Sequence, residues 1–230
     1  MKRKTSFFIV LLTISLFQAM NCISFAKPIT FTLLHVNDTH SHLDPKTEIL
    51  PIDGNPTQVQ LGGLIFLKTA LDRISDADNN ILFLHAGDAV QGTMYFIKFN
   101  GQTDQIYLNH MPVTAMTLGN HEFDRTSSFL AKFRDGLSFP VLCSNIDTQT
   151  DPDLKGKFVP YEICEIEGEK IGIIGLITPE VITSSSPGKY VQFFSPEARA
   201  QAAVKDLQRQ GINKIIVLSH IGIDADIELA

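Results

Sequence analysis

The sequence lacks the basic runs that bind a nucleic-acid backbone. Its 230 residues include 19 Lys and Arg against 25 Asp and Glu, a formal net charge of -6, and no long basic run occurs after the first four positions. Such a chain offers no positive field to extended nucleic acid, which we exclude as an expected partner. A small phosphorylated substrate remains compatible with this balance, because bound cations can reverse the local charge of an acidic site.

A long apolar run is also missing. The apolar segment 7–17 is shorter than the roughly 20 residues that a bilayer-spanning helix needs. It follows Lys2-Arg3-Lys4 and is followed by Ser24-Phe25-Ala26, a pattern typical of a cleavable export signal. We therefore predict a signal peptide at residues 1–26 and an exported protein, periplasmic or extracellular, with no stable membrane span after cleavage. An uncleaved membrane anchor and a lipoprotein attached at Cys22 are the alternatives.

Cysteine is scarce, with three in the whole chain. Removal of the signal leaves Cys143 and Cys164, and neither lies in the paired-cysteine spacing of metal sites. The two thiols could pair in an oxidising compartment, but sequence alone does not decide a pairing. We expect two buried free thiols.

Internal repeats and low-complexity tracts are absent from the sequence, and 44% of the residues are apolar, enough for one sizeable core. Short β-rich apolar runs alternate with helical patterns, as in an α/β domain. Residues 64–74 carry leucine and isoleucine at helical spacing, and a second helix is bracketed by Ser195 as its cap, Pro196 in its first turn and Gly211 as its terminator. Strands are predicted at 29–36, 81–85, 113–118, 140–144, 159–165, 170–177 and 214–219.

The segments between these elements add two expectations. Glu167-Gly168-Glu169 separates two strand-like runs and predicts a hairpin turn, which makes the sheet system mixed. Residues 44–56 and 183–188 are polar segments with Pro and Gly, and they predict loops near a site. We expect no domain boundary within residues 27–230.

Polar side chains of metal-ligand type follow four of the predicted strands. They are Asp38 and His40, Asp88, Asn120, and His220. Strand ends of an α/β sheet project into one crevice, which is where such folds bind ligands. A mixture of carboxylate, amide and imidazole donors suits Zn, Mn or Fe better than an all-oxygen Ca or Mg cage. Because a carboxylate such as Asp88 can bridge two metal ions, the pattern predicts metal-dependent hydrolysis of a phosphoester.

Longer motifs surround these residues at 34–42, 86–93 and 115–124, and further matches occur at 170–179 and 218–220. In these motifs the chain resembles the calcineurin-like metallophosphoesterases of the secreted 5'-nucleotidase family, over roughly the whole of residues 27–230. The resemblance implies an α/β fold of four layers, an α/β/β/α sandwich in which helices flank two mixed sheets.

The resemblance also implies roles for individual residues and two divalent metal ions, with Zn or Mn expected. Five residues would be ligands: Asp38 and His40 for the first ion, Asp88 as the bridge, and Asn120 with His220 for the second. His121 would stabilise charge on the phosphoryl group, and Asp124 would orient the His121 imidazole. The expected reaction is 5'-nucleotidase-type release of phosphate from a small nucleotide or other phosphoester, with hydroxide on the metal pair as nucleophile.

The sequence departs from the family after Ser219-His220. Members of the family carry a Gly-His-x-His motif downstream, which supplies one more ligand to each metal ion, and then a nucleotide-binding domain; neither occurs before Ala230. We therefore expect a catalytic domain that is incomplete on its C-terminal side. Two alternatives stay open: a non-catalytic remnant that binds metal weakly, and a 2',3'-cyclic-nucleotide phosphodiesterase or nucleotide-sugar hydrolase of the same family. The sequence identifies neither the nucleotide nor a protein partner.

Overall fold

Two β-sheets form the centre of the computed structural model, which describes residues 28–78 and 80–230. The first sheet has the strand order β1-β4-β5-β6, and all neighbours run parallel. Its strands are β1 (Thr32–Val36), β4 (Ile81–His85), β5 (Val113–Thr117) and β6 (Val141–Leu142). Parallel neighbours bring their carboxyl ends to one edge of the sheet, where ligands bind in such folds. The predicted signal peptide at residues 1–26 lies outside the described residues.

The second sheet is mixed, as the sequence predicted. Its order is β11-β9-β8, in which β11 (Lys214–His220) runs parallel to β9 (Glu169–Ile177), and β8 (Tyr161–Ile166) runs antiparallel to β9. Glu167 and Gly168 form the predicted hairpin turn between β8 and β9, with φ angles of 51° and 81°. A further antiparallel pair joins β7 (Ile146–Asp147) to β10 (Gln192–Phe193).

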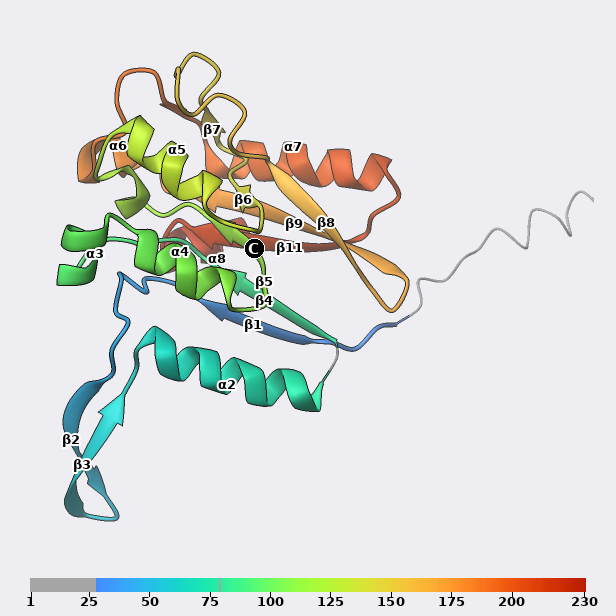
Figure 1. Cartoon of the computed structure of the whole chain (residues 1–230). Coiled ribbons are helices and arrows are strands. Elements are labelled where there is room, and N and C mark those ends of the chain that lie inside the picture. Colours follow the sequence, from blue (N-terminus) through green and yellow to red (C-terminus); the bar gives the residue numbers. More distant parts are fainter. Residues whose placement is uncertain (1–27, 79) are drawn as a thin grey trace, which may run out of the picture. The chain divides into compact units, whose positions relative to one another are not determined.

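The two sheets pack face to face. In Figure 1 they lie between α7 on one side and the helices α2 and α4 on the other. Leu82 and Leu84 of β4 lie between the sheets with Ile173 of β9 and Leu218 of β11, whereas Phe83 faces the opposite way into the helices. This alternation follows from the two-residue period of a strand. Since each sheet is covered by helices on its outer face, the predicted four-layer α/β/β/α sandwich is confirmed. The expectation that both sheets are mixed is wrong for the first sheet, whose four described strands all run parallel.

The helices occupy the two outer layers. The first sheet is covered by α2 (Leu64–Ala77), α3 (Met94–Phe99), α4 (Gln102–Asn109) and α5 (Ser127–Asp135). The second sheet is covered by α7 (Pro196–Arg209), through Ala200, Ala203 and Leu207. The cap of α7 is as predicted, since the Ser195 hydroxyl accepts a hydrogen bond from the Ala198 amide at 3.2 Å. Three short elements complete the chain: the 3-10 turn η1 (His121–Phe123), α6 (Val181–Ser184) and α8 (Ile223–Leu229).

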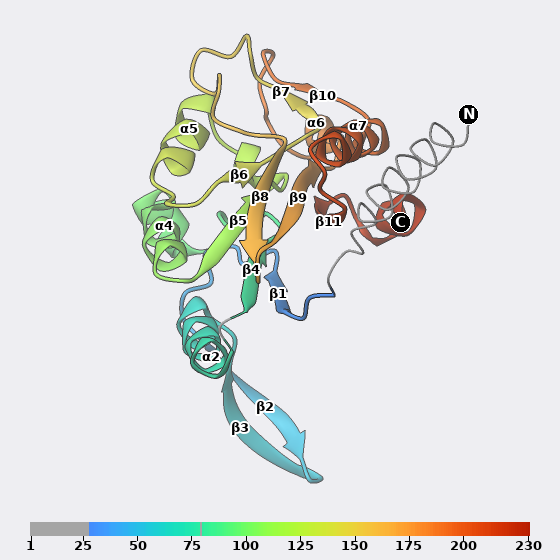
Figure 2. The same ribbon diagram turned by 90° about the vertical axis from the view of Figure 1, so that its right-hand side faces the viewer.

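The prediction of a loop at residues 44–56 is wrong, because most of this segment belongs to a β-hairpin. Strands β2 (Lys46–Ile52) and β3 (Asn55–Leu61) pair antiparallel around Asp53 and Gly54, whose φ angles are 51° and 81°. Asp-Gly is a favoured two-residue hairpin turn, because both of its positions need positive φ. Figure 2 shows the hairpin extending beyond α2 and away from the sheets.

Two smaller expectations also need correction. The predicted loop at 183–188 begins inside α6, which includes Thr183 and Ser184. Cys143 and Cys164 are both free, as predicted, but only Cys143 is buried while Cys164 is half-buried. None of the helices in the described ranges is long and apolar enough to cross a membrane.

Candidate metal centre

The side chains predicted from the strand ends gather at the carboxyl edge of the first sheet. Asp38 and His40 lie on the turn after β1, Asp88 lies on the turn after β4, and His220 is the last residue of β11. Asp38, His40 and Asp88 have positive φ angles of 51°, 45° and 56°. Such left-handed backbone is unfavourable for residues other than glycine, and it concentrates at functional sites where the surrounding structure holds it.

Backbone hydrogen bonds join the turn after β1 to the turn after β4. The Asp38 amide donates to the Gly87 carbonyl at 3.0 Å, the His40 amide to the Asp88 carbonyl at 3.1 Å, and the Ser41 amide to the Ala89 carbonyl at 3.0 Å. The parallel pairing of β1 with β4 therefore continues past both strand ends. The two turns hold their side chains in a fixed mutual position.

Asp88 lies at the centre of the gathered side chains, with only 3% of its side chain exposed. Its Oδ2 is 3.4 Å from His220 Nε2 and 3.8 Å from His40 Nε2, and Asp38 Oδ1 is 3.4 Å from the same His40 atom. Two groups of potential ligand atoms share Asp88: one adds Asp38 and His220, and the other adds His40 and His121. A carboxylate shared in this way meets the requirement for the predicted bridge between two metal ions.

The grouping differs in part from the division predicted by sequence. The sequence predicted that Asp38 and His40 bind one ion. In the structure Asp38 groups with Asp88 and His220, whereas His40 groups with Asp88 and His121. Asn120 is half-buried between Gly119 and η1, and no side-chain hydrogen bond fixes its amide within the described residues. The assignment of individual residues as ligands remains a prediction.

The imidazoles of His40 and His220 are oriented by backbone carbonyls. His40 Nδ1 is 3.3 Å from the Val90 carbonyl oxygen, and His220 Nδ1 is 2.7 Å from the Ala86 carbonyl oxygen. Nδ1 of each ring donates to its carbonyl, so Nε2 is the nitrogen that faces Asp88, and a metal ion would take the place of the Nε2 proton. Both rings therefore present the nitrogen that a metal ion needs.

Electrostatics favours positive charge at the position that Asp88 faces. Burial opposes ionisation of Asp88, but the hydrogen bonds from His220 and from the His121 amide outweigh it and lower the pKa of this carboxyl. Burial would lower the pKa of His220, but its hydrogen bond to Asp88 and the Asp88 charge raise that pKa to about 9. A site that holds a proton so firmly also attracts a cation, and its mixed carboxylate and imidazole donors fit divalent metal ions.

His121 and Asp124 form the predicted pair beside this centre. His121 Nδ1 is 2.6 Å from Asp124 Oδ2, and both side chains are partly exposed, at 30% and 21%. Burial alone would lower the pKa of His121, but the hydrogen bond to Asp124 and the charge of Asp88 raise it. The arrangement holds the ring by one nitrogen and leaves Nε2 free to donate to an anion.

A buried carboxylate that the sequence analysis assigned no role connects the ligand turns. Glu122 is fully buried and accepts three backbone hydrogen bonds, from Gly119 at 2.6 Å, Ala89 at 2.8 Å and Asp88 at 2.9 Å. Burial and the nearby Asp88 charge raise the pKa of Glu122, whereas the three amides oppose this rise. Glu122 therefore fixes the turn after β4 to the loop after β5. Its position within the motif at 115–124 was the available signal.

A second unassigned acid lies below the turn after β1. Asp104 of α4 is fully buried and accepts a hydrogen bond from the equally buried Ser41 hydroxyl at 2.9 Å. Its other oxygen has no hydrogen-bond partner among the described residues. Because Ser41 follows His40 directly, Asp104 supports the turn that carries Asp38 and His40.

Among the remaining histidines, only His85 is tied to the ligand turns by its side chain within the described residues. It is fully buried, and its Nε2 is 3.0 Å from the Thr39 hydroxyl, between Asp38 and His40 in sequence. The Gly87 amide donates to His85 Nδ1 at 3.2 Å, so the ring is the tautomer that donates from Nε2. Burial lowers the pKa of His85 to about 4, which keeps it neutral.

The turns after β4 and β5 approach too closely for any side chain at Gly119. A Cβ atom built there would lie 2.1 Å from Asp88 Oδ1 and 2.6 Å from the Asp88 amide nitrogen. Glycine at this position therefore lets the carboxylate lie against the loop that carries Asn120 and His121.

Three features together are typical of one class of protein: the four-layer fold, the Asp88 carboxylate that two ligand groups share, and the His121–Asp124 pair. Residues 31–228 match the calcineurin-like phosphoesterases, and the chain belongs to this family, whose members use divalent metal ions. The resemblance predicted from the motifs is therefore confirmed.

The relatives that this chain resembles include nucleotidases. The chain is 42% identical over 205 residues to the NAD 5'-nucleotidase of Haemophilus influenzae and 40% identical over 200 residues to a probable 5'-nucleotidase of Treponema pallidum, and it covers 34% of each. Among solved structures, the Haemophilus influenzae NAD nucleotidase superposes with a TM-score of 0.84 over 89% of this chain and 41% of that one. A 5'-nucleotidase precursor from Thermus thermophilus, at 43% identity, gives 0.83 over 88% and 39%. The chain thus spans about a third of the length of the curated relatives it matches.

Proposed function

We propose that this chain carries the metal centre of a phosphoesterase that releases phosphate from small nucleotides. One observation carries the proposal: Asp88 belongs to two groups of ligand atoms at once, beside a histidine held by a carboxylate. Two divalent cations held by these residues would supply the charge that hydrolysis of a phosphoester needs.

Five residues are the proposed ligands, as the sequence predicted: Asp38, His40, Asp88, Asn120 and His220. Their donor set favours Zn or Mn. Once bound, such ions would polarise the phosphoryl oxygens and lower the pKa of a water molecule at the site. The chain itself supplies the alignment, through the joined turns after β1 and β4 and through the Glu122 carboxylate.

His121 is the proposed charge-stabilising residue. Its Nδ1 is held by Asp124 at 2.6 Å, so Nε2 can donate a hydrogen bond to a phosphoryl oxygen as negative charge develops there. Asp124 keeps the ring in position and favours its protonated form. The rings of His121 and His40 are in T-shaped contact with centroids 5.0 Å apart, which supports a position of this donor beside the proposed ligands.

Nucleotides are the proposed substrates because the relatives named above are nucleotidases. Cyclic nucleotides and nucleotide sugars need the same metal chemistry, so a substrate panel separates these possibilities. The panel is run on the chain from residue 27 to 230.

Substitution of Asp88 tests the proposal. Asp88→Asn should abolish both the binding of two metal ions and phosphate release, whereas Asp153→Asn removes an exposed carboxylate and should change neither. Metal content and phosphate release are measured on the same samples. Turnover retained by Asp88→Asn would refute the metal assignment. A wild-type protein that binds metal but hydrolyses no member of the panel would favour the non-catalytic alternative.

We also propose that the chain is exported, with a signal peptide at 1–26, to the periplasm or the outside of the cell. The support is the basic, apolar and small-residue pattern of the first 26 positions. Mass spectrometry of the mature protein should find Lys27 as its first residue. An intact N-terminus in a cell-associated protein would instead indicate the membrane-anchor alternative.

A further inference from the structure

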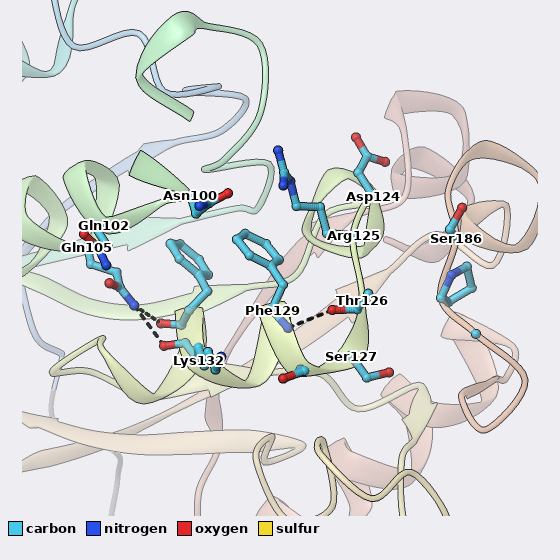
Figure 3. A pocket seen from close by; sticks show the side chains of 14 residues that line it. Asn100, Gln102, Gln105, Asp124, Arg125, Thr126, Ser127, Phe129, Lys132 and Ser186 are labelled. Carbon is cyan, nitrogen blue, oxygen red and sulfur yellow. Dashed lines mark hydrogen bonds between the residues drawn. The ribbon is translucent and has the colours of Figure 1, made fainter. Parts of the chain in front are cut away.

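A solvent-open pocket of about 940 Å³ lies beside the His121–Asp124 pair. Figure 3 shows its lining, which comes from the α3–α4 junction at Asn100, from the segment Asp124–Ser128, from α5, and from the chain at Ser186. Asp124 belongs both to this lining and to the pair, so the pocket adjoins the proposed phosphoryl site. Its volume is sufficient for a nucleotide-sized group.

The pocket carries positive charge in an acidic chain. Its lining includes Arg125 and Lys132, and among the lining residues Asp124 is the sole carboxylate, already engaged by His121. Neither cation takes part in an ion pair within residues 28–78 and 80–230. With a net charge of -6 on the whole chain, two cations that face a pocket without a free carboxylate favour an anionic occupant.

Aromatic side chains hold the Arg125 guanidinium in place. Its Cζ lies 4.7 Å from the centroid of the Phe96 ring and 5.9 Å from that of Phe129. Phe129 in turn stacks on Phe133 with centroids 6.3 Å apart and an interplanar angle of 10°, and meets Phe96 edge to face. These contacts occupy the ring faces, which leaves little aromatic surface for a base but keeps the N–H donors of Arg125 available.

We propose that this pocket is a binding subsite for a phosphate group of the substrate other than the one that is cleaved. Arg125 is the main recognition group and Lys132 adds charge. The proposal rests on the proposed function for its place in catalysis, because it assigns the neighbouring His121 to the cleaved group. It predicts that substrates with a second phosphate, such as nucleoside diphosphates, bind better than nucleoside monophosphates.

Inorganic pyrophosphate is the probe for binding, and calorimetry on the metal-free chain keeps the measurement independent of turnover. Arg125→Met preserves an apolar side chain over the two rings but removes the charge and the donors. It should raise the Kd for pyrophosphate about tenfold or more, the usual effect of losing a charge-assisted hydrogen bond. Arg125→Lys should retain part of the affinity, and Arg209→Ala, an exposed arginine of α7, should retain all of it.

The kinetic arm compares a nucleoside diphosphate with the matching monophosphate. Arg125→Met should raise the ratio of the diphosphate KM to the monophosphate KM about tenfold, while Arg209→Ala should leave this ratio unchanged. An unchanged pyrophosphate Kd in folded Arg125→Met overturns the subsite. So does an equal rise in KM for both nucleotides. Absence of turnover with every substrate overturns the proposed function instead, and the calorimetry then still decides whether the pocket binds pyrophosphate.

Discussion

Replacement of Glu122 by Gln tests whether a buried carboxylate holds the ligand turns together. In the wild type, Oε2 accepts from the Asp88 and Gly119 amides and Oε1 accepts from the Ala89 amide. The Gln carbonyl can keep the first two bonds, but its NH2 group then faces the Ala89 N–H. Two buried donors are left without acceptors, at about 1 to 3 kcal/mol each. We expect Glu122→Gln to lower the free energy of unfolding by about 2 to 6 kcal/mol.

Urea denaturation of the metal-free chain measures this loss apart from metal binding. The matched control is Glu48→Gln, which makes the same chemical change on the exposed strand β2 and should alter stability by less than about 0.5 kcal/mol. The Glu122 variant should also bind metal more weakly, because the turn that carries Asp88 loses one of its attachments. Equal stabilities for the two variants would refute the role given to Glu122.

Three further predictions follow from the same region. Gly119→Ala places a Cβ 2.1 Å from Asp88 Oδ1, so we expect a loss of about 3 kcal/mol in urea unfolding and no metal in the purified protein. Burial raises the pKa of Asp104 to about 6, near the buried Glu122, so the folded chain holds this proton more tightly than the unfolded chain. The stability that protonated Asp104 contributes is therefore present below about pH 4 and lost as the pH rises through 6. The stability of Asp104→Asn relative to wild type should increase by up to about 3 kcal/mol between pH 4 and 7. Parallel pH profiles of the two proteins would contradict the assignment. Removal of metal with a chelator should lower Tm, and Zn or Mn at 100 times its Kd should restore about 2.7 kcal/mol, a response that Asp88→Asn should lack.

The parts of the fold that could be predicted from sequence are those with a strong local pattern. The strand at Ile81–His85 is almost wholly buried and reads as a continuous apolar run. The helix at Pro196–Arg209 carries its own start signal in Ser195 and Pro196. In both cases the local preference agrees with the tertiary structure.

The missed parts have local signals that conflict or are absent. The hairpin at residues 46–61 contains Pro51 and Pro56 and exposes apolar side chains such as Ile49, so its composition resembles a loop, although Asp53-Gly54 was a usable turn signal. The helix α3 is apolar on nearly every side and shows no polar face to mark its period.

The candidate site likewise contains residues that the sequence predicts and residues that it does not. The motif residues could be predicted because they follow apolar strands in a fixed order, and the structure places Asp38, His40, Asp88, His121 and His220 together. Asp104 could not be predicted, because its partner Ser41 is 63 positions away and nothing near it in sequence indicates a buried acid. Arg125 was equally invisible, since its function depends on the pocket and on the rings of Phe96 and Phe129.

The pairing that continues from β1 and β4 into the two ligand turns has a consequence for exchange kinetics. Turns at a binding site normally open often, and their amides exchange quickly with solvent deuterium. Here the Asp38, His40 and Ser41 amides are bonded to carbonyls of the facing turn, so they should exchange as slowly as amides within the two strands. The centre would then open only when the sheet itself opens, and its lifetime as an ordered site would equal that of the core.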